Sequence, residues 1–68
     1  MIDMHNKIVA VTGANRGVGF VTATRLAEAG AEIVMVCRDA HRGEEAHAWI
    51  AERATGPPPQ LFIADLSS

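Results

Sequence analysis

The sequence predicts an α/β fold in which three parallel strands alternate with two helices. Three observations carry this prediction: short apolar runs separated by stretches with helical spacing, a glycine-rich turn directly after the first run, and a globular composition. Of the 68 residues, 49% are hydrophobic and 21% are charged, which excludes disordered and fibrous classes. Because parallel strands need crossover connections, we expect each helix to link two neighbouring strands.

The first expected strand covers residues 7–12, a β-branched apolar run typical of a strand that is covered on both faces. It leads into the turn Thr-Gly-Ala-Asn-Arg-Gly-Val-Gly at residues 12–19. There Gly13 can take the positive φ that turns the chain, Gly17 lets the main chain approach a pyrophosphate, and Gly19 lets a helix lie close to the strand. The N–H groups that begin this helix would face the phosphates, so the turn predicts a dinucleotide-phosphate loop.

The remaining elements are bounded by glycine, aspartate and proline. A first helix is expected from residue 18 to about residue 29 and a second strand over residues 32–37, with Gly30 between them. Asp39 can cap a second helix from about residue 40 to residue 54, and three prolines separate that helix from a third strand over residues 60–64. The strand order implied is 3-2-1, with both helices on one face of the sheet.

Each expected helix has one side of small or apolar residues that can pack on the sheet. The other face of the sheet and the free edge of the first strand have no neighbour within these elements. We therefore expect residues 1–68 to be the βαβαβ half of a larger doubly wound domain, in which a third helix begins at residues 67–68. The alternative is a partner chain that covers the open face. The residues on these sides are Gly19, Thr22, Ala23, Leu26 and Gly30 in the first helix and Gly43, Ala46, Trp49 and Ile50 in the second. Trp49 is expected to be a packing residue of the core or of its edge.

Several classes of function are disfavoured. A formal net charge of −2 gives no basic surface for nucleic acid or an anionic membrane. The first seven residues lack the features of a secretory signal, and no apolar run approaches the roughly 20 residues that span a bilayer. Cys37, the single cysteine, cannot form an internal disulfide, so a cytoplasmic location is expected. Cys37 and the three histidines lack the spacing of a metal site, so no metal is expected.

Four segments together resemble the short-chain dehydrogenase/reductase family over residues 7–68: the glycine turn, the first helix, the stretch Val36-Cys37-Arg38-Asp39, and Asp65-Leu66 after the third strand. The Cys-Arg-Asp triplet is similar to members related to retinol dehydrogenases, which act on lipophilic carbonyls and alcohols. The resemblance implies a Rossmann-type fold and an oxidoreductase with a nicotinamide dinucleotide cofactor. The contacts it implies to this cofactor come from Gly13, Asn15, Arg16, Gly17, Val18, Gly19, Arg38, Asp65 and Leu66.

Charge at the end of the second strand favours NADP over NAD. NAD enzymes usually hold the ribose 2′-hydroxyl with a carboxylate at this position, and a carboxylate would repel a 2′-phosphate. Here the position is Cys37, Arg38 follows it, and Arg16 lies in the glycine turn, so two guanidinium groups can grip the phosphate. Two alternatives stay open: Asp39 either caps the second helix or binds the ribose, and Asp65 either binds the adenine amino group, as the resemblance implies, or caps the next helix.

The groups that this family uses for chemistry are a Tyr-x-x-x-Lys pair and a substrate-orienting serine. The chain has no tyrosine, its only lysine is Lys7 in the first strand, and Ser67 and Ser68 come too early for that serine. We therefore expect no catalytic residue and interpret the chain as the NADP-binding amino-terminal portion of an oxidoreductase. Two other interpretations remain: a nucleotide-binding or interaction module without catalysis, which pairs with itself or with another chain, and a glycine turn that is only structural.

Overall fold

The computed structural model describes residues 3–14 and 17–64. The three strands are parallel and lie in the order β1-β2-β3, which is the predicted order 3-2-1 counted from the other edge. The α/β prediction is therefore confirmed, and no predicted element boundary differs from the observed one by more than one residue. The elements are β1 (Ile8–Thr12), α1 (Gly17–Glu28), β2 (Glu32–Cys37), α2 (Ala40–Arg53) and β3 (Gln60–Ile63).

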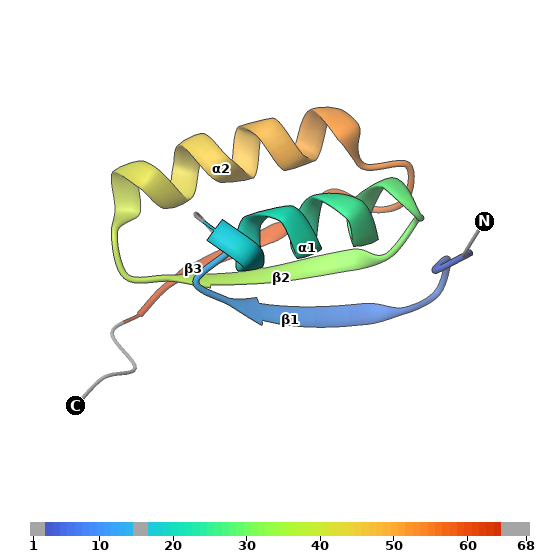
Figure 1. Ribbon diagram of the computed structural model, residues 1–68, viewed down its shortest axis with the longest axis horizontal. Coiled ribbons are helices and arrows are strands. Elements are labelled where there is room, and N and C mark those ends of the chain that lie inside the picture. The colour runs from blue at the N-terminus through green and yellow to red at the C-terminus, as the bar shows by residue number, and fades with distance from the viewer. Residues whose placement is uncertain (1–2, 15–16, 65–68) are drawn as a thin grey trace.

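Both helices cover the same face of the sheet, as predicted, and give a two-layer arrangement (Figure 1). The helix α1 connects β1 to β2, and α2 connects β2 to β3. Because the strands are parallel, their carboxyl ends lie at one edge of the sheet, together with the starts of both helices. The turn after β1 and the bend after β2 therefore meet at this edge.

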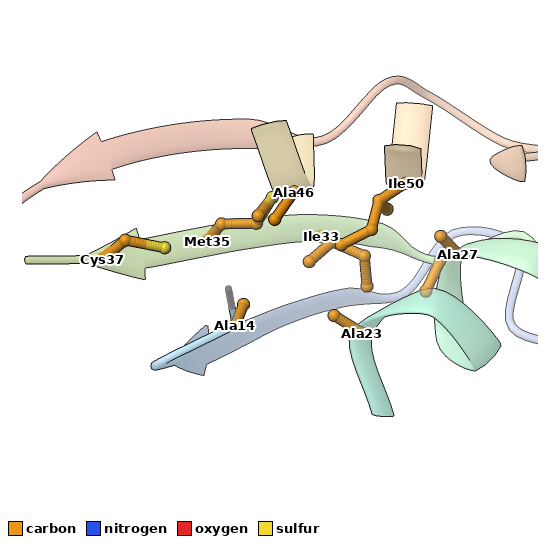
Figure 2. Packing of buried hydrophobic residues seen from close by; sticks show 9 residues of the cluster. Ala14, Ala23, Ala27, Ile33, Met35, Cys37, Ala46 and Ile50 are labelled. Atoms are coloured by element: carbon orange, nitrogen blue, oxygen red, sulfur yellow. The ribbon is translucent and has the colours of Figure 1, made fainter. Parts of the chain in front are cut away.

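The central strand β2 supplies most of the core because its alternate side chains face the helices. The side chains of Ile33, Met35 and Cys37 are at most 1% exposed, whereas the residues between them point to the other face and are half-buried. Figure 2 shows Ile33 and Met35 among short side chains from the two helices, which allow close packing of helix on strand. The buried helix residues in this view are Ala23, Ala27, Ala46 and Ile50.

One residue predicted to face the sheet from α1 does not do so. Thr22 is exposed, and the buried positions of this helix are Ala23 and Ala27. Residues four apart lie on one face of a helix, whereas neighbouring residues are rotated by about 100°. The sheet-facing line through Ala23 and Ala27 therefore leaves Thr22 on the flank of the helix.

Trp49 in α2 is an edge packing residue, one of the two packing positions that the sequence leaves open. Its neighbour Ile50 is fully buried, whereas Trp49 is 46% exposed. The Trp49 ring packs beside Phe20 of α1, with 6.3 Å between ring centroids, and the Arg53 guanidinium lies 3.4 Å from its centroid. Trp49 is thus a packing residue at the edge of the helix layer.

The second face of the sheet carries no helix in the described part of the chain. Strand register pairs Ala10 with Val34 and Val36 with Phe62, and paired residues of parallel strands point to the same face. On this face the side chain of Ile8 is 71% exposed and that of Phe62 is 52% exposed. The uncovered apolar face expected from the sequence is therefore present among the described residues.

At the amino ends of the strands, on the far side from the glycine turn, the segment after α2 is hydrogen-bonded to the carboxyl end of α1. Thr55 donates its backbone N–H to the carbonyl of Ala27 at 3.1 Å and its hydroxyl to the carbonyl of Glu28 at 3.0 Å. These are carbonyls that a helix end leaves without partners. A Cβ built on Gly56 would lie 2.2 Å from the carbonyl oxygen of Gly30, so the two connecting segments touch backbone to backbone.

Candidate functional site

The glycine turn lies at the carboxyl end of β1 and leads directly into α1. Gly13 has φ +66° and Gly17 has φ +61°, values that side chains rarely adopt. Gly13 also donates its N–H to the carbonyl of Val36 at 2.9 Å, which ties the turn to the end of β2. A Cβ at Gly13 or Gly17 would meet no described atom within 4 Å, so backbone conformation is what requires glycine there.

At Gly19 a side chain is excluded by close contact with neighbouring atoms, and not by the backbone conformation. A Cβ at Gly19 would lie 2.7 Å from the carbonyl oxygen of Gly13 and 3.4 Å from that of Thr12. Both atoms belong to the backbone and cannot swing aside as a flexible side chain does. The first turn of α1 therefore lies directly against the turn that leaves β1.

The structure brings together four of the predicted cofactor residues at the start of α1: Gly13, Gly17, Val18 and Gly19. Ala14 fills the space beneath the turn and is fully buried, a role that sequence reasoning missed, although its small size next to Gly13 was a usable signal. Four further predicted residues lie outside the described residues: Asn15, Arg16, Asp65 and Leu66.

Cys37 ends β2, as the sequence predicted, and its side chain faces the helix layer (Figure 2). It is 1% exposed, and a Cβ on Gly43 of α2 would come within 3.2 Å of the Cys37 Cβ. Sequence reasoning placed Gly43 on the sheet-facing side but missed this close contact, which depends on tertiary packing. Arg38, the next residue, is exposed at the edge where the strands end.

Asp39 caps α2. Its side-chain Oδ1 accepts the N–H of Arg42 at 3.0 Å, and its backbone carbonyl accepts the N–H of Gly43 at 2.8 Å. The bond from the Arg42 N–H lowers the pKa of the Asp39 carboxyl below its usual 3.8, since it stabilises the charged form. The capping interpretation of Asp39 is thus confirmed, and the carboxylate at this bend is engaged by the helix.

Among the described residues, the other titratable groups give no second site near the glycine turn. Asp3 and His5 form a contact of 2.5 Å between Oδ1 and Nδ1, but both are exposed and lie at the amino end of the sheet. Within residues 3–14 and 17–64, no group of three or more histidine, cysteine, aspartate or glutamate side chains is arranged to hold a metal ion. Neither helix in the same ranges is long and apolar enough to cross a membrane.

The comparison with protein-family models decides the family. The model of the short chain dehydrogenases matches residues 7–67. The chain belongs to the short chain dehydrogenase family. The match includes the glycine turn, both helices and all three strands, so the resemblance inferred from the sequence motifs is confirmed.

Curated relatives in this family are much longer than the chain. Retinol dehydrogenase 14 of Mus musculus is 54% identical to this chain over an alignment of 71 residues. The alignment covers 93% of this chain and 21% of the relative. Human dehydrogenase/reductase SDR family member 13 is 41% identical and is matched by 100% of this chain over 18% of its own length. The chain thus spans about a fifth of the length of these short chain dehydrogenases.

Solved short chain dehydrogenase structures share the same fold. The RhlG/NADP active-site complex from Pseudomonas aeruginosa has a TM-score of 0.88 at 33% identity and covers 98% of this chain and 26% of its own. L-sorbose reductase from Gluconobacter frateurii, in complex with NADPH and L-sorbose, has a TM-score of 0.88 at 27% identity, with 98% and 25% covered. These similarities agree with the Rossmann-type interpretation of the βαβαβ unit.

Proposed function

We propose that the chain is the NADP(H)-binding amino-terminal portion of a short-chain dehydrogenase/reductase that acts on a carbonyl or alcohol substrate. The observation that carries this proposal is the geometry of residues 12–14 at the end of β1 and of residues 17–19 at the start of α1. Gly13 and Gly17 hold left-handed conformations, Gly19 lies against the backbone of the turn, and α1 begins there. Such a turn leaves backbone N–H groups exposed at the positive end of a helix, where a diphosphate binds favourably.

A dinucleotide fits the described part of this edge. The space that a Cβ would occupy at Gly13 and Gly17 is free of described atoms, which permits close approach of a diphosphate to the main chain. We assign the diphosphate to the backbone of residues 13–19. When bound, the nicotinamide group would donate or accept a hydride. The contacts proposed are those predicted from the sequence: Gly13, Asn15, Arg16, Gly17, Val18, Gly19, Arg38, Asp65 and Leu66.

NADP is favoured over NAD by the charges at the end of β2. Cys37 is uncharged and buried, and Oδ1 of the Asp39 carboxylate accepts the Arg42 N–H, which supports a cap for Asp39 in place of a ribose contact. Arg38 follows at the edge, and we assign it to the 2′-phosphate together with Arg16. Each such charged contact contributes about 1.5–3 kcal/mol, which corresponds to a preference of roughly tenfold or more. Two similar solved structures are complexes with NADP or NADPH, which supports a nicotinamide dinucleotide.

The remainder of the function requires residues beyond these 68. The chain has no tyrosine, so it cannot supply the Tyr-x-x-x-Lys pair that members of this family use, and we propose that it is catalytically incomplete by itself. In a doubly wound domain a further layer of helices would cover the apolar face with Ile8 and Phe62. The alternative is a module without catalysis whose open face is covered by another copy or a partner chain. The cytoplasmic location expected from the sequence remains a prediction.

Calorimetric titration with NADP and with NAD tests the proposal. We expect Arg38→Ala to raise the Kd for NADP by roughly ten- to a hundredfold and to leave the Kd for NAD within about twofold, because only NADP carries the 2′-phosphate. Arg25→Ala is the matched control, since Arg25 is an exposed arginine in the last turn of α1, at the other end of the helix. Absence of binding to either nucleotide, or tighter binding of NAD than of NADP, would contradict the proposal.

A further inference from the structure

We infer that Asp39 is a positioning residue for Arg38: its cap on α2 fixes the bend after β2 and thereby the point on the backbone from which the Arg38 side chain reaches a 2′-phosphate. The inference rests on the proposed function, because it assigns a second residue to the same phosphate contact. Asp39 need not touch the cofactor for this role, and it would act through the backbone on either side of Arg38.

The helix side of the bend is fixed by two hydrogen bonds to one residue. The Oδ1 atom of Asp39 accepts the N–H of Arg42 at 3.0 Å, and the carbonyl oxygen of Asp39 accepts the N–H of Gly43 at 2.8 Å. Two of the first N–H groups of α2 are therefore satisfied by Asp39 alone. Its backbone dihedrals, φ −100° and ψ 116°, are the extended values typical of a capping residue.

The strand side of the bend is fixed by packing and by the sheet. Cys37 is 1% exposed, and its carbonyl accepts the N–H of Ala64 at 2.9 Å, directly after β3. Its Cβ also lies in close contact with Gly43, the residue whose N–H closes the first turn of α2. Arg38 is thus a single residue between two anchored neighbours, and Gly43 is in contact with both of them.

This arrangement lowers the conformational freedom that a ligand must remove when it binds Arg38. Affinity depends on such ordering costs as well as on contacts, so a group that is held in place by its backbone binds more tightly than the same group on a loose turn. Without the cap, the first turn of α2 is less ordered, and part of the binding free energy is then spent on ordering the bend. Only a ligand with a 2′-phosphate contacts Arg38, so only such a ligand would bind more weakly.

The test uses two small probes that differ in the 2′-phosphate, 2′,5′-ADP and 5′-AMP. Asp39→Asn and Asp39→Ser are the matched controls, because both keep a capping oxygen and, like Asp39→Ala, remove the negative charge. We expect Asp39→Ala to bind 2′,5′-ADP roughly three- to tenfold more weakly than either control, the range that corresponds to a lost cap. The three variants should differ by less than about twofold in their binding of 5′-AMP.

A double-substitution cycle separates this inference from the proposed function. If the cap acts through Arg38, then Asp39→Ala and Asp39→Asn bind 2′,5′-ADP equally well in a protein that already carries Arg38→Ala. The inference is overturned if Asp39→Ala binds more weakly than Asp39→Asn by the same factor in both backgrounds, or by the same factor for both probes. It is also overturned if Asn and Ser bind 2′,5′-ADP no better than Ala. If Arg38→Ala itself leaves 2′,5′-ADP binding unchanged, the proposed phosphate contact is wrong.

Discussion

Gly19 packs directly on the carbonyl oxygen of Gly13, so the two ends of the glycine turn are in contact through backbone atoms. A single methyl group at Gly19 would lie 2.7 Å from that oxygen and 3.2 Å from the Gly13 carbonyl carbon. The distance between the end of β1 and the start of α1 is therefore set without any side chain. A diphosphate at this turn would bind to main-chain groups whose spacing depends on this one contact.

We predict that Gly19→Ala destabilises the fold by about 1–3 kcal/mol, because the backbone must move to admit the methyl group. The same movement displaces the turn, so NADP binding should weaken as well. Val21→Ala is the control, since Val21 is a half-exposed residue of the same helix and its truncation should change stability by less than about 0.5 kcal/mol. Urea unfolding and nucleotide titration check both effects, and unaltered stability of Gly19→Ala would show that the contact is not tight.

Ile50 provides a test of the helix-on-sheet packing. It is fully buried on the sheet-facing side of α2, and we expect Ile50→Ala to cost about 2–5 kcal/mol, a large fraction of the stability of a small domain. Val21→Ala truncates a residue of α1 that is 50% exposed and does not lie on the open face of the sheet, so it should change stability by less than about 0.5 kcal/mol. Similar unfolding midpoints for the two variants would mean that the helix layer does not cover β2 as described.

The Asp39 cap predicts a specific response to acid. The pKa of this carboxyl is lowered below its usual 3.8 by the Arg42 N–H, so its ionised form stabilises the folded state. That contribution is complete above the pKa of the unfolded chain and is lost as the pH falls through the lower pKa of the folded state. Asp39→Asn should therefore show a shallower loss of unfolding free energy below about pH 4 than the unaltered protein. Parallel curves in acid would exclude a stabilising role for the charge.

The open face of the sheet predicts association of the isolated chain. Phe62 is 52% exposed among other apolar residues of that face, and exposed apolar surface of this kind favours contact with another molecule. We expect sedimentation to show a concentration-dependent oligomer, and Phe62→Glu to shift it toward the monomer. Val21→Glu places the same charge on the outer side of α1 and should not. A monomer with a cooperative melt at all concentrations would contradict this prediction.

The spacing of hydrophobic residues and the positions of turn residues were sufficient to predict the five elements, their boundaries to within one residue, and the strand order. They failed for Thr22, because periodicity defines a broad stripe and only packing decides which residues within it are covered. For the same reason they left Trp49 open between core and edge packing. Asp39 illustrates the same limit in the site. Its position before a helix favoured a cap, but the choice between cap and ribose ligand depended on whether its Oδ1 reaches the Arg42 N–H. The contact of Gly43 with Cys37 joins two elements and has no local sequence signal.

The backbone contact between Gly56 and Gly30 has a practical consequence for engineering the protein. Because the segments after α1 and α2 are in contact there, we expect that lengthening or cutting either of them loosens both helices. Circular permutants and reporter insertions that open the chain at residues 29–31 or 55–57 should therefore fail together.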